Sequence, residues 1–297
     1  MNIKPYTLVS FVAFWILTLS FQSCTEDITD QIKSELNAAT NKLVVDGEIT
    51  TGTTRHRVTL KKATDYFSNG ALPAVSNATV YILDDTIKYP LTEDPATPGN
   101  YYTNPNVYGI PGHTYTLIIK DVDINNDRIM EQYSASCKIS PPIFADSIGI
   151  KPVKRMRRSN YSILIYSTDP KQTANYYMFR VRRNGIMLSD TITKCGFTND
   201  QFFNGSRLNG IQVYSLRPDY KAEHLKISDT ITLETCMITK DYLKFFTDLR
   251  LEVQGSNPFG GQPANVSTNI APKDLATGFF TAYSITRKST IVKDTIQ

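Results

Sequence analysis

The sequence predicts a mainly β protein, and three of its features support that prediction. It contains 17 Tyr and 14 Phe against one Trp, and aromatic side chains favour the half-buried surface of a pleated strand. It also contains 15 Gly and 15 Pro, which supply the turns that many short strands need. Apolar and polar residues alternate, as in Tyr115, Leu117 and Ile119 against their neighbours. We therefore expect two tandem β-sandwich domains within the 297 residues.

The first residues have the pattern of a secretory signal. Lys4 gives a positive start, and residues 8–21 are apolar apart from small hydroxyl side chains. This run is shorter than the roughly 18 residues of a membrane-spanning helix. Gln22, Ser23 and Cys24 follow it, and the small residue directly before the cysteine resembles a lipobox. We expect residues 1–23 to be removed and Cys24 to carry an acyl anchor to a lipid membrane; the alternative is a plain signal peptide with an incidental cysteine.

An acidic pair, Glu26 and Asp27, follows the expected anchor. It resembles the signal that sends Bacteroidota lipoproteins to the outer face of the outer membrane, and this resemblance implies a cell-surface location. The alternative is a solvated tether, because short acidic runs are common in exposed chain. Residues 24–41 are polar with scattered Ile and Leu, so we expect a tether over that stretch.

We expect the folded part to consist of an N-terminal sandwich over residues 42–142 and a C-terminal sandwich over residues 143–297. Short strand-like runs follow one another without long amphipathic segments between them, which is typical of sandwiches. The expected strands are 43–49, 56–61, 78–83, 115–120 and 129–138 in the first domain, and 161–165, 177–182, 211–216, 227–238 and 279–291 in the second. In the second set Arg180 and Arg182 alternate with apolar residues, so we expect them to face solvent.

One segment departs from the β pattern. Its apolar residues recur at helical spacing and are Tyr242, Phe245, Phe246 and Leu249. Thr239 stands where it can cap the first turn. We therefore expect a helix over residues 240–250, packed on the C-terminal domain by its apolar stripe.

The four cysteines do not form an even set once Cys24 is assigned to lipid. Cys137, Cys195 and Cys236 remain, so at most one disulfide can form within the chain. We expect Cys195 and Cys236 to be the pair, because each follows a similar strand-like run in the same half of the chain. Cys137 ends an alternating run and is expected to be a small buried hydrophobic residue.

The composition and motifs argue against several classes of protein. The formal charge of +4 comes from 32 basic and 28 acidic residues, a balance that disfavours a nucleic-acid binder recognised by bulk charge. The three histidines lie far apart, and the sequence has no nucleophile elbow, phosphate-binding loop or dinucleotide fingerprint. We expect no catalysis and no cofactor. A hydrolase is the remaining enzymatic alternative, because paired carboxylates leave no short signature.

The most metal-like stretch is a loop in which every second side chain carries oxygen. These residues are Asp121, Asp123, Asn125 and Asp127. Such spacing resembles a Ca²⁺ loop, since a hard cation needs many oxygen ligands. Asn126 takes the place of the usual glycine, however, and Glu131 is one position away from the expected acidic ligand. A hairpin loop is the alternative, because Asn and Asp accept left-handed backbone in tight turns.

Five tripeptides have the form Asp-Thr/Ser-Ile. They resemble the O-glycosylation acceptor of Bacteroidota envelope proteins, and their hydroxyl residues are Thr86, Ser147, Thr191, Thr230 and Thr295. Thr and Ile also favour strands and Asp starts turns, so some matches are expected by chance. We expect one or two of them to be modified.

Longer runs carry a resemblance to known families. The N-terminal runs are 44–49, 75–80, 99–102 and 112–117, and they resemble transthyretin-like or carboxypeptidase-regulatory-like sandwiches. The C-terminal runs are 174–177, 239–249, 257–259, 269–270 and 278–280. Taken together, the chain resembles domain-of-unknown-function family 4249 of Bacteroidota lipoproteins over nearly its whole mature length.

The family resemblance implies an outer-membrane lipoprotein, commonly encoded beside a TonB-dependent transporter, with no established catalysis. We therefore expect a non-enzymatic accessory or substrate-binding partner of such a transporter, acting on an unidentified nutrient. A stand-alone surface glycan-binding or adhesive module is the alternative. A long loop rich in Gly and Pro is the expected place of partner contact, with structural bracing as its alternative role. Its candidate residues are Asn257, Pro258, Phe259, Asn265 and Asn269.

Overall fold

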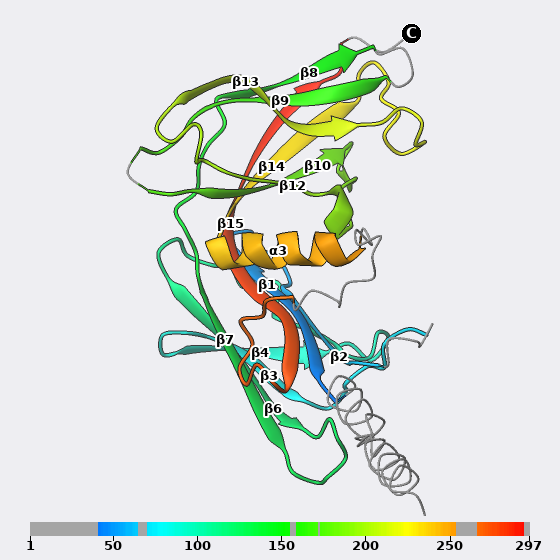
Figure 1. The fold of residues 1–297 in the computed structure, drawn as a ribbon, viewed down its shortest axis with the longest axis vertical. Coiled ribbons are helices and arrows are strands. Elements are labelled where there is room, and N and C mark those ends of the chain that lie inside the picture. Colours follow the sequence, from blue (N-terminus) through cyan, green and yellow to red (C-terminus); the bar gives the residue numbers. More distant parts are fainter. Residues whose placement is uncertain (1–40, 65–69, 155–158, 172, 254–265, 294–297) are drawn as a thin grey trace, which may run out of the picture. The chain divides into compact units, whose positions relative to one another are not determined.

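The computed structural model describes residues 41–64, 70–154, 159–171, 173–253 and 266–293, and these contain fifteen strands and one α-helix (Figure 1). The prediction of a mainly β fold with one helix is confirmed. Within these ranges no helix is long and apolar enough to cross a membrane.

The first seven strands surround one hydrophobic core. Their bounds are β1 Leu43–Thr50, β2 Arg57–Lys62, β3 Thr79–Asp84, β4 Ile87–Glu93, β5 Asn100–Tyr102, β6 Thr114–Val122 and β7 Glu131–Lys138. They are hydrogen-bonded in the order β1-β2-β5-β4-β3-β6-β7. The alternation in β6 places Tyr115, Leu117 and Ile119 inside the core, as predicted, because successive strand residues point to opposite faces.

The next strands surround a second core. Their bounds are β8 Ser147–Val153, β9 Asn160–Thr168, β10 Tyr176–Arg183, β11 Ile186–Met187, β12 Gly196–Asn199, β13 Arg207–Leu216 and β14 Thr230–Ile238, with a 3₁₀ turn at Ile192–Lys194. One sheet has the order β13-β9-β8, and β10 pairs with β11, β12 and β14 in the other. Tyr161, Ile163 and Ile165 of β9 are buried between them.

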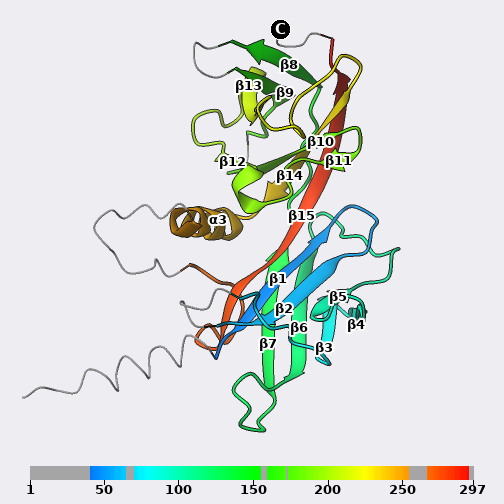
Figure 2. The ribbon, with the colours of Figure 1, turned by 90° about the vertical axis from the view of Figure 1, so that its right-hand side faces the viewer.

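The last strand, β15 (Ala276–Ile291), belongs to both sets of strands. Its first half pairs parallel with β1, where Gly47 stands opposite Phe280. Its second half pairs antiparallel with β14, where Cys236 stands opposite Ile285. Figure 2 shows β15 running from beside β1 to beside β14. Because one strand connects the two sets, the domain bounds 42–142 and 143–297 stay a prediction.

The helix α3 (Lys240–Val253) lies where the apolar stripe predicted it and runs three residues beyond the expected end at residue 250. The Thr239 hydroxyl accepts a hydrogen bond from the Tyr242 amide at 3.2 Å, so Thr239 caps the first turn. Tyr242 and Leu243 pack against a small third core whose members are Met178, Cys195, Cys236, Ile238 and Tyr283. The helix therefore covers the outer face of β10, β14 and β15.

Candidate functional site

Many of the predicted site residues lie outside the described residues. They are Cys24, Glu26, Asp27, Asn257, Pro258, Phe259, Asn265 and Thr295. The anchor, the export signal, most of the partner loop and one glycosylation site therefore stay predictions.

Asn269 is the one candidate of the partner loop inside the described ranges. Its Nδ2 donates to the Phe280 carbonyl at 2.7 Å, and its Oδ1 accepts from the Phe280 amide at 3.0 Å. The neighbouring Thr268 hydroxyl donates to the Gly278 carbonyl at 2.7 Å. These two side chains satisfy backbone groups along β15, in agreement with the bracing alternative.

Cys195 and Cys236 are separate buried thiols, not the disulfide that we expected. Cys195 directly precedes β12, Cys236 lies in β14, and β10 runs between these two strands. Met178 of β10 pairs with Cys236 on one side and with Phe197 of β12 on the other. Two strand spacings amount to about 10 Å, beyond the roughly 7 Å at which two Cα atoms can be bridged. Burial raises the pKa of Cys195 to about 11 and of Cys236 to about 12, so both remain protonated and poorly nucleophilic at neutral pH.

The Ca²⁺ candidate forms the hairpin loop between β6 and β7. Both carboxylate oxygens of Asp123 accept backbone hydrogen bonds, from Asp127 at 3.1 Å and Arg128 at 3.0 Å. Asp127 in turn accepts from the Ile129 amide at 2.7 Å. Asp121 has a positive φ of 61°, as the hairpin alternative anticipates. In the described part of the chain no three His, Cys, Asp or Glu side chains gather to hold a metal, and Ca²⁺ binding stays a prediction.

The four described glycosylation candidates are exposed at turns or strand starts. They are Thr86, Ser147, Thr191 and Thr230. Each is accessible to a modifying enzyme, and modification stays a prediction.

A pocket of about 550 Å³ lies between α3 and the strands β1, β10 and β15, and we call it the α3 pocket. This volume is within the range of small-molecule sites. Its apolar wall contains the predicted helical stripe, so that stripe faces a pocket as well as a core. The Tyr242 and Phe245 rings stack at 6.1 Å with an interplanar angle of 10°, and each lies 5.2 Å from Phe279.

The charged residues that line the α3 pocket are Asp46, Arg180 and Asp190. Asp46 pairs with Arg57 at 3.4 Å, and Asp190 pairs with Lys194 at 2.8 Å. Burial raises the pKa of the Tyr242 hydroxyl well above its usual value, so this hydroxyl stays protonated. The pocket therefore offers aromatic faces and charged groups that already have partners in the chain.

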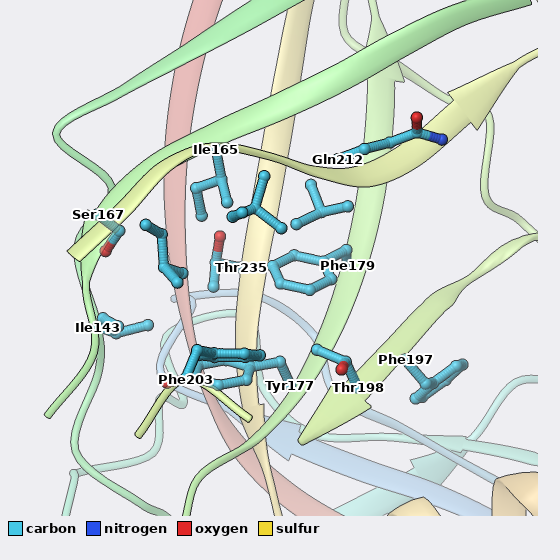
Figure 3. A pocket seen from close by; sticks show the side chains of 13 residues that line it. Ile143, Ile165, Ser167, Tyr177, Phe179, Phe197, Thr198, Phe203, Gln212 and Thr235 are labelled. Carbon is cyan, nitrogen blue, oxygen red and sulfur yellow. The ribbon is translucent and has the colours of Figure 1, made fainter. Parts of the chain in front are cut away.

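A second cavity, of about 240 Å³, lies inside the second core, and we call it the interior cavity (Figure 3). Aliphatic side chains from β9 and β13 face aromatic rings from β10 and β12 across it. Its polar wall residues are all uncharged and comprise Ser167, Thr198, Gln212 and Thr235, together with the Tyr177 hydroxyl.

Beside the α3 pocket, one buried carboxylate forms ion pairs with three arginine side chains. Glu234 of β14 is 0% exposed; its oxygens accept from Arg180 Nε at 3.0 Å, Arg182 Nε at 2.8 Å and Arg287 Nε at 2.9 Å. Arg180 and Arg182 are only 17% and 32% exposed, which corrects the expectation that they face solvent. Burial alone would raise the pKa of Glu234, but the Arg180 charge and the other two arginine hydrogen bonds outweigh it and lower the pKa.

A family model described as Domain of unknown function (DUF4249) matches residues 28–289. The chain belongs to the DUF4249 family. The match runs through β1 to β14 and most of β15, so the DUF4249 unit spans both large cores and the helix between them. The comparison with curated proteins found no match.

Sequence reasoning missed both cavities and the arginine cluster of this DUF4249 chain. The cavities leave no local signal, because their walls come from strands far apart in the sequence. Glu234 did leave a local signal, since it is the one charged residue in β14. A lone acid in such a run needs a buried basic partner.

Proposed function

We propose that this chain is a non-enzymatic accessory subunit that binds ligand for a TonB-dependent transporter in nutrient uptake. An acyl group on Cys24 would hold it at the outer membrane, and the acidic pair after Cys24 would direct it to the cell surface. The family resemblance supports the lipoprotein character and the transporter partner.

The α3 pocket is the observation that carries the ligand-binding part of this proposal. It combines a suitable volume with aromatic walls and a few polar groups, the usual composition of a small-molecule site. Its walls come from α3 and from strands of both sets, so a bound ligand contacts a rigid scaffold on several sides. The Cys195 thiol in this pocket is protonated, which supports binding rather than nucleophilic catalysis.

Co-purification tests the transporter partnership. The full-length native lipoprotein is extracted in mild detergent, and we expect an outer-membrane barrel protein to be recovered with it. Phe245→Ala, in the α3 pocket, should lower that recovery if ligand in the pocket stabilises the complex. Phe202→Ala is the matched control, because Phe202 is 92% exposed outside the pocket. Recovery without any barrel protein, under conditions that preserve a known transporter–lipoprotein complex, would contradict the proposal.

The stacked rings of Tyr242 and Phe245 also favour the alternative, a stand-alone glycan-binding module, because sugar rings pack on aromatic faces. A glycan array probed with the purified chain distinguishes the two. Binding that Phe245→Ala abolishes, together with no barrel protein in the co-purification, would favour the glycan-binding module.

A further inference from the structure

We propose that the interior cavity binds an uncharged, planar aromatic group of about two fused rings. This inference goes beyond the proposed function, since it concerns a second site and its test involves no transporter. Protein interiors pack densely, with few voids larger than a water molecule. A cavity of about 240 Å³ in the middle of a core is therefore a feature to be explained.

The lining selects an uncharged ligand. Two of its polar groups already have partners within the chain: the Ser167 hydroxyl donates to the Phe144 carbonyl at 3.1 Å, and Gln212 Oε1 accepts from Ser162 at 2.9 Å. The Tyr177 hydroxyl donates to Asp169, so its proton already has an acceptor within the chain. A charged ligand would find no opposite charge among the lining residues, and burying an unpaired charge is costly.

The shape of the wall selects a flat ligand. The rings of Tyr177 and Phe179 lie 6.0 Å apart at 12°, and those of Tyr177 and Phe203 lie 6.2 Å apart at 28°. These nearly parallel rings form one side of the cavity, and aliphatic side chains including Ile165 form the opposite side (Figure 3). A planar ring placed between the two sides contacts both with its faces.

The volume sets the size of the ligand. An apolar cavity of roughly 150 Å³ stays dry and binds benzene. The interior cavity is larger, at about 240 Å³, and has room for a second fused ring. We therefore expect a naphthalene-sized group to fit.

The entrance lies along β13. Ile211, which lines the cavity, is 47% exposed, and its neighbour Gln212 is exposed as well. The pairing of β13 with β9 shifts register on both sides of these two residues. Such bulges redirect side chains and are frequent beside functional sites. Gly196 lets β12 approach β13, because a Cβ there would stand 2.7 Å from the Val213 carbonyl oxygen.

The test is binding of naphthalene to the purified full-length chain, followed by equilibrium dialysis and by thermal unfolding. We expect one molecule bound per chain and a rise in melting temperature. 2-Naphthoate, which has the same rings and a negative charge, should bind at least tenfold more weakly. Absence of naphthalene binding, or equal binding of 2-naphthoate, would overturn the proposal.

Two variants locate the site. Ile211→Trp places a large side chain at the entrance, and Thr235→Leu places more volume inside the cavity; each should weaken naphthalene binding at least tenfold. Ile186→Trp is the matched control, since Ile186 is 71% exposed on β11 and should leave binding unchanged. Ile211 is on the surface, so Ile211→Trp tests the site even if Thr235→Leu fails to fold. Undiminished binding by Ile211→Trp would place the naphthalene elsewhere and refute the assignment.

Discussion

At the scale of single residues, Glu234 of β14 links β10 and β15 through its ion pairs with Arg180, Arg182 and Arg287. It is fully buried, and three arginines surround it. A buried ion pair is weak evidence for net stabilisation, but removing one partner leaves the other charges without compensation. Loss of the Glu234 charge should therefore weaken the packing of β10, β14 and β15.

We expect Glu234→Gln to lower the free energy of unfolding by about 3 kcal/mol, because the arginines lose their common counter-charge. Asp190→Asn is the control, since the Asp190–Lys194 pair is 57% and 45% exposed and its loss should change stability far less. Urea denaturation of both variants measures the difference. Equal, small losses would show that the buried cluster behaves as a surface pair.

The pH dependence of the stability of wild type and Glu234→Gln gives a second prediction. The pKa of Glu234 is lowered from its ordinary value of 4.5, so its ionised form is stabilised by folding. That contribution is complete above pH 4.5 and is lost as the pH falls through the folded-state pKa. The stability difference between wild type and Glu234→Gln should therefore shrink below pH 4.5. A difference that stays constant to lower pH in denaturation curves would disprove this.

At the scale of elements, the parallel pairing of β1 with β15 depends on a glycine. Gly278 has φ +91°, and a Cβ on it would stand 2.0 Å from the Val45 carbonyl oxygen. Only a residue without a side chain allows the two strands to approach at this point.

We expect Gly278→Ala to destabilise the protein by at least about 2 kcal/mol more than Gly112→Ala does. Gly112 has nearly the same φ, +90°, but nothing lies within 4 Å of its added Cβ. The comparison thus separates the clash with β1 from the cost of the positive φ alone. Thermal unfolding of the two variants provides the measurement, and equal losses would mean that β1 yields easily.

At the scale of the whole molecule, β15 is hydrogen-bonded to strands of both large cores, and we predict that it couples their unfolding. We expect Ile163→Ala, in the second core, to cost about 3 kcal/mol and to speed hydrogen exchange equally in β9 and in β6 of the first core. Ile119→Ala is the reciprocal variant, and both side chains are fully buried. Wild-type protection of β6 in Ile163→Ala would show that the cores open independently.

The sequence predicted the local structure well. Alternation placed Tyr115, Leu117 and Ile119 in the first core, and the helical stripe with its Thr239 cap located α3. Both signals are short-range, since they depend on the period of one strand or one helix.

Long-range features could not be predicted in the same way. Gly47 and Phe280 are far apart in the sequence, and a local pattern does not specify that their strands pair in parallel. Arg180 and Arg182 were placed on the solvent face for the same reason: alternation defines two faces but not what covers each one. The cavities likewise depend on how several elements meet.

The parallel pairing of β1 and β15 also has a mechanical consequence. Leu43 begins β1 and donates a backbone hydrogen bond to Leu275 at 2.9 Å, directly ahead of β15. Tension applied to the chain before Leu43 acts along β1, which lies between β2 and β15. Its ladder to β15 is then loaded in shear, with many hydrogen bonds sharing the force instead of opening one after another. We therefore expect β1 to resist extraction when the chain is pulled ahead of Leu43.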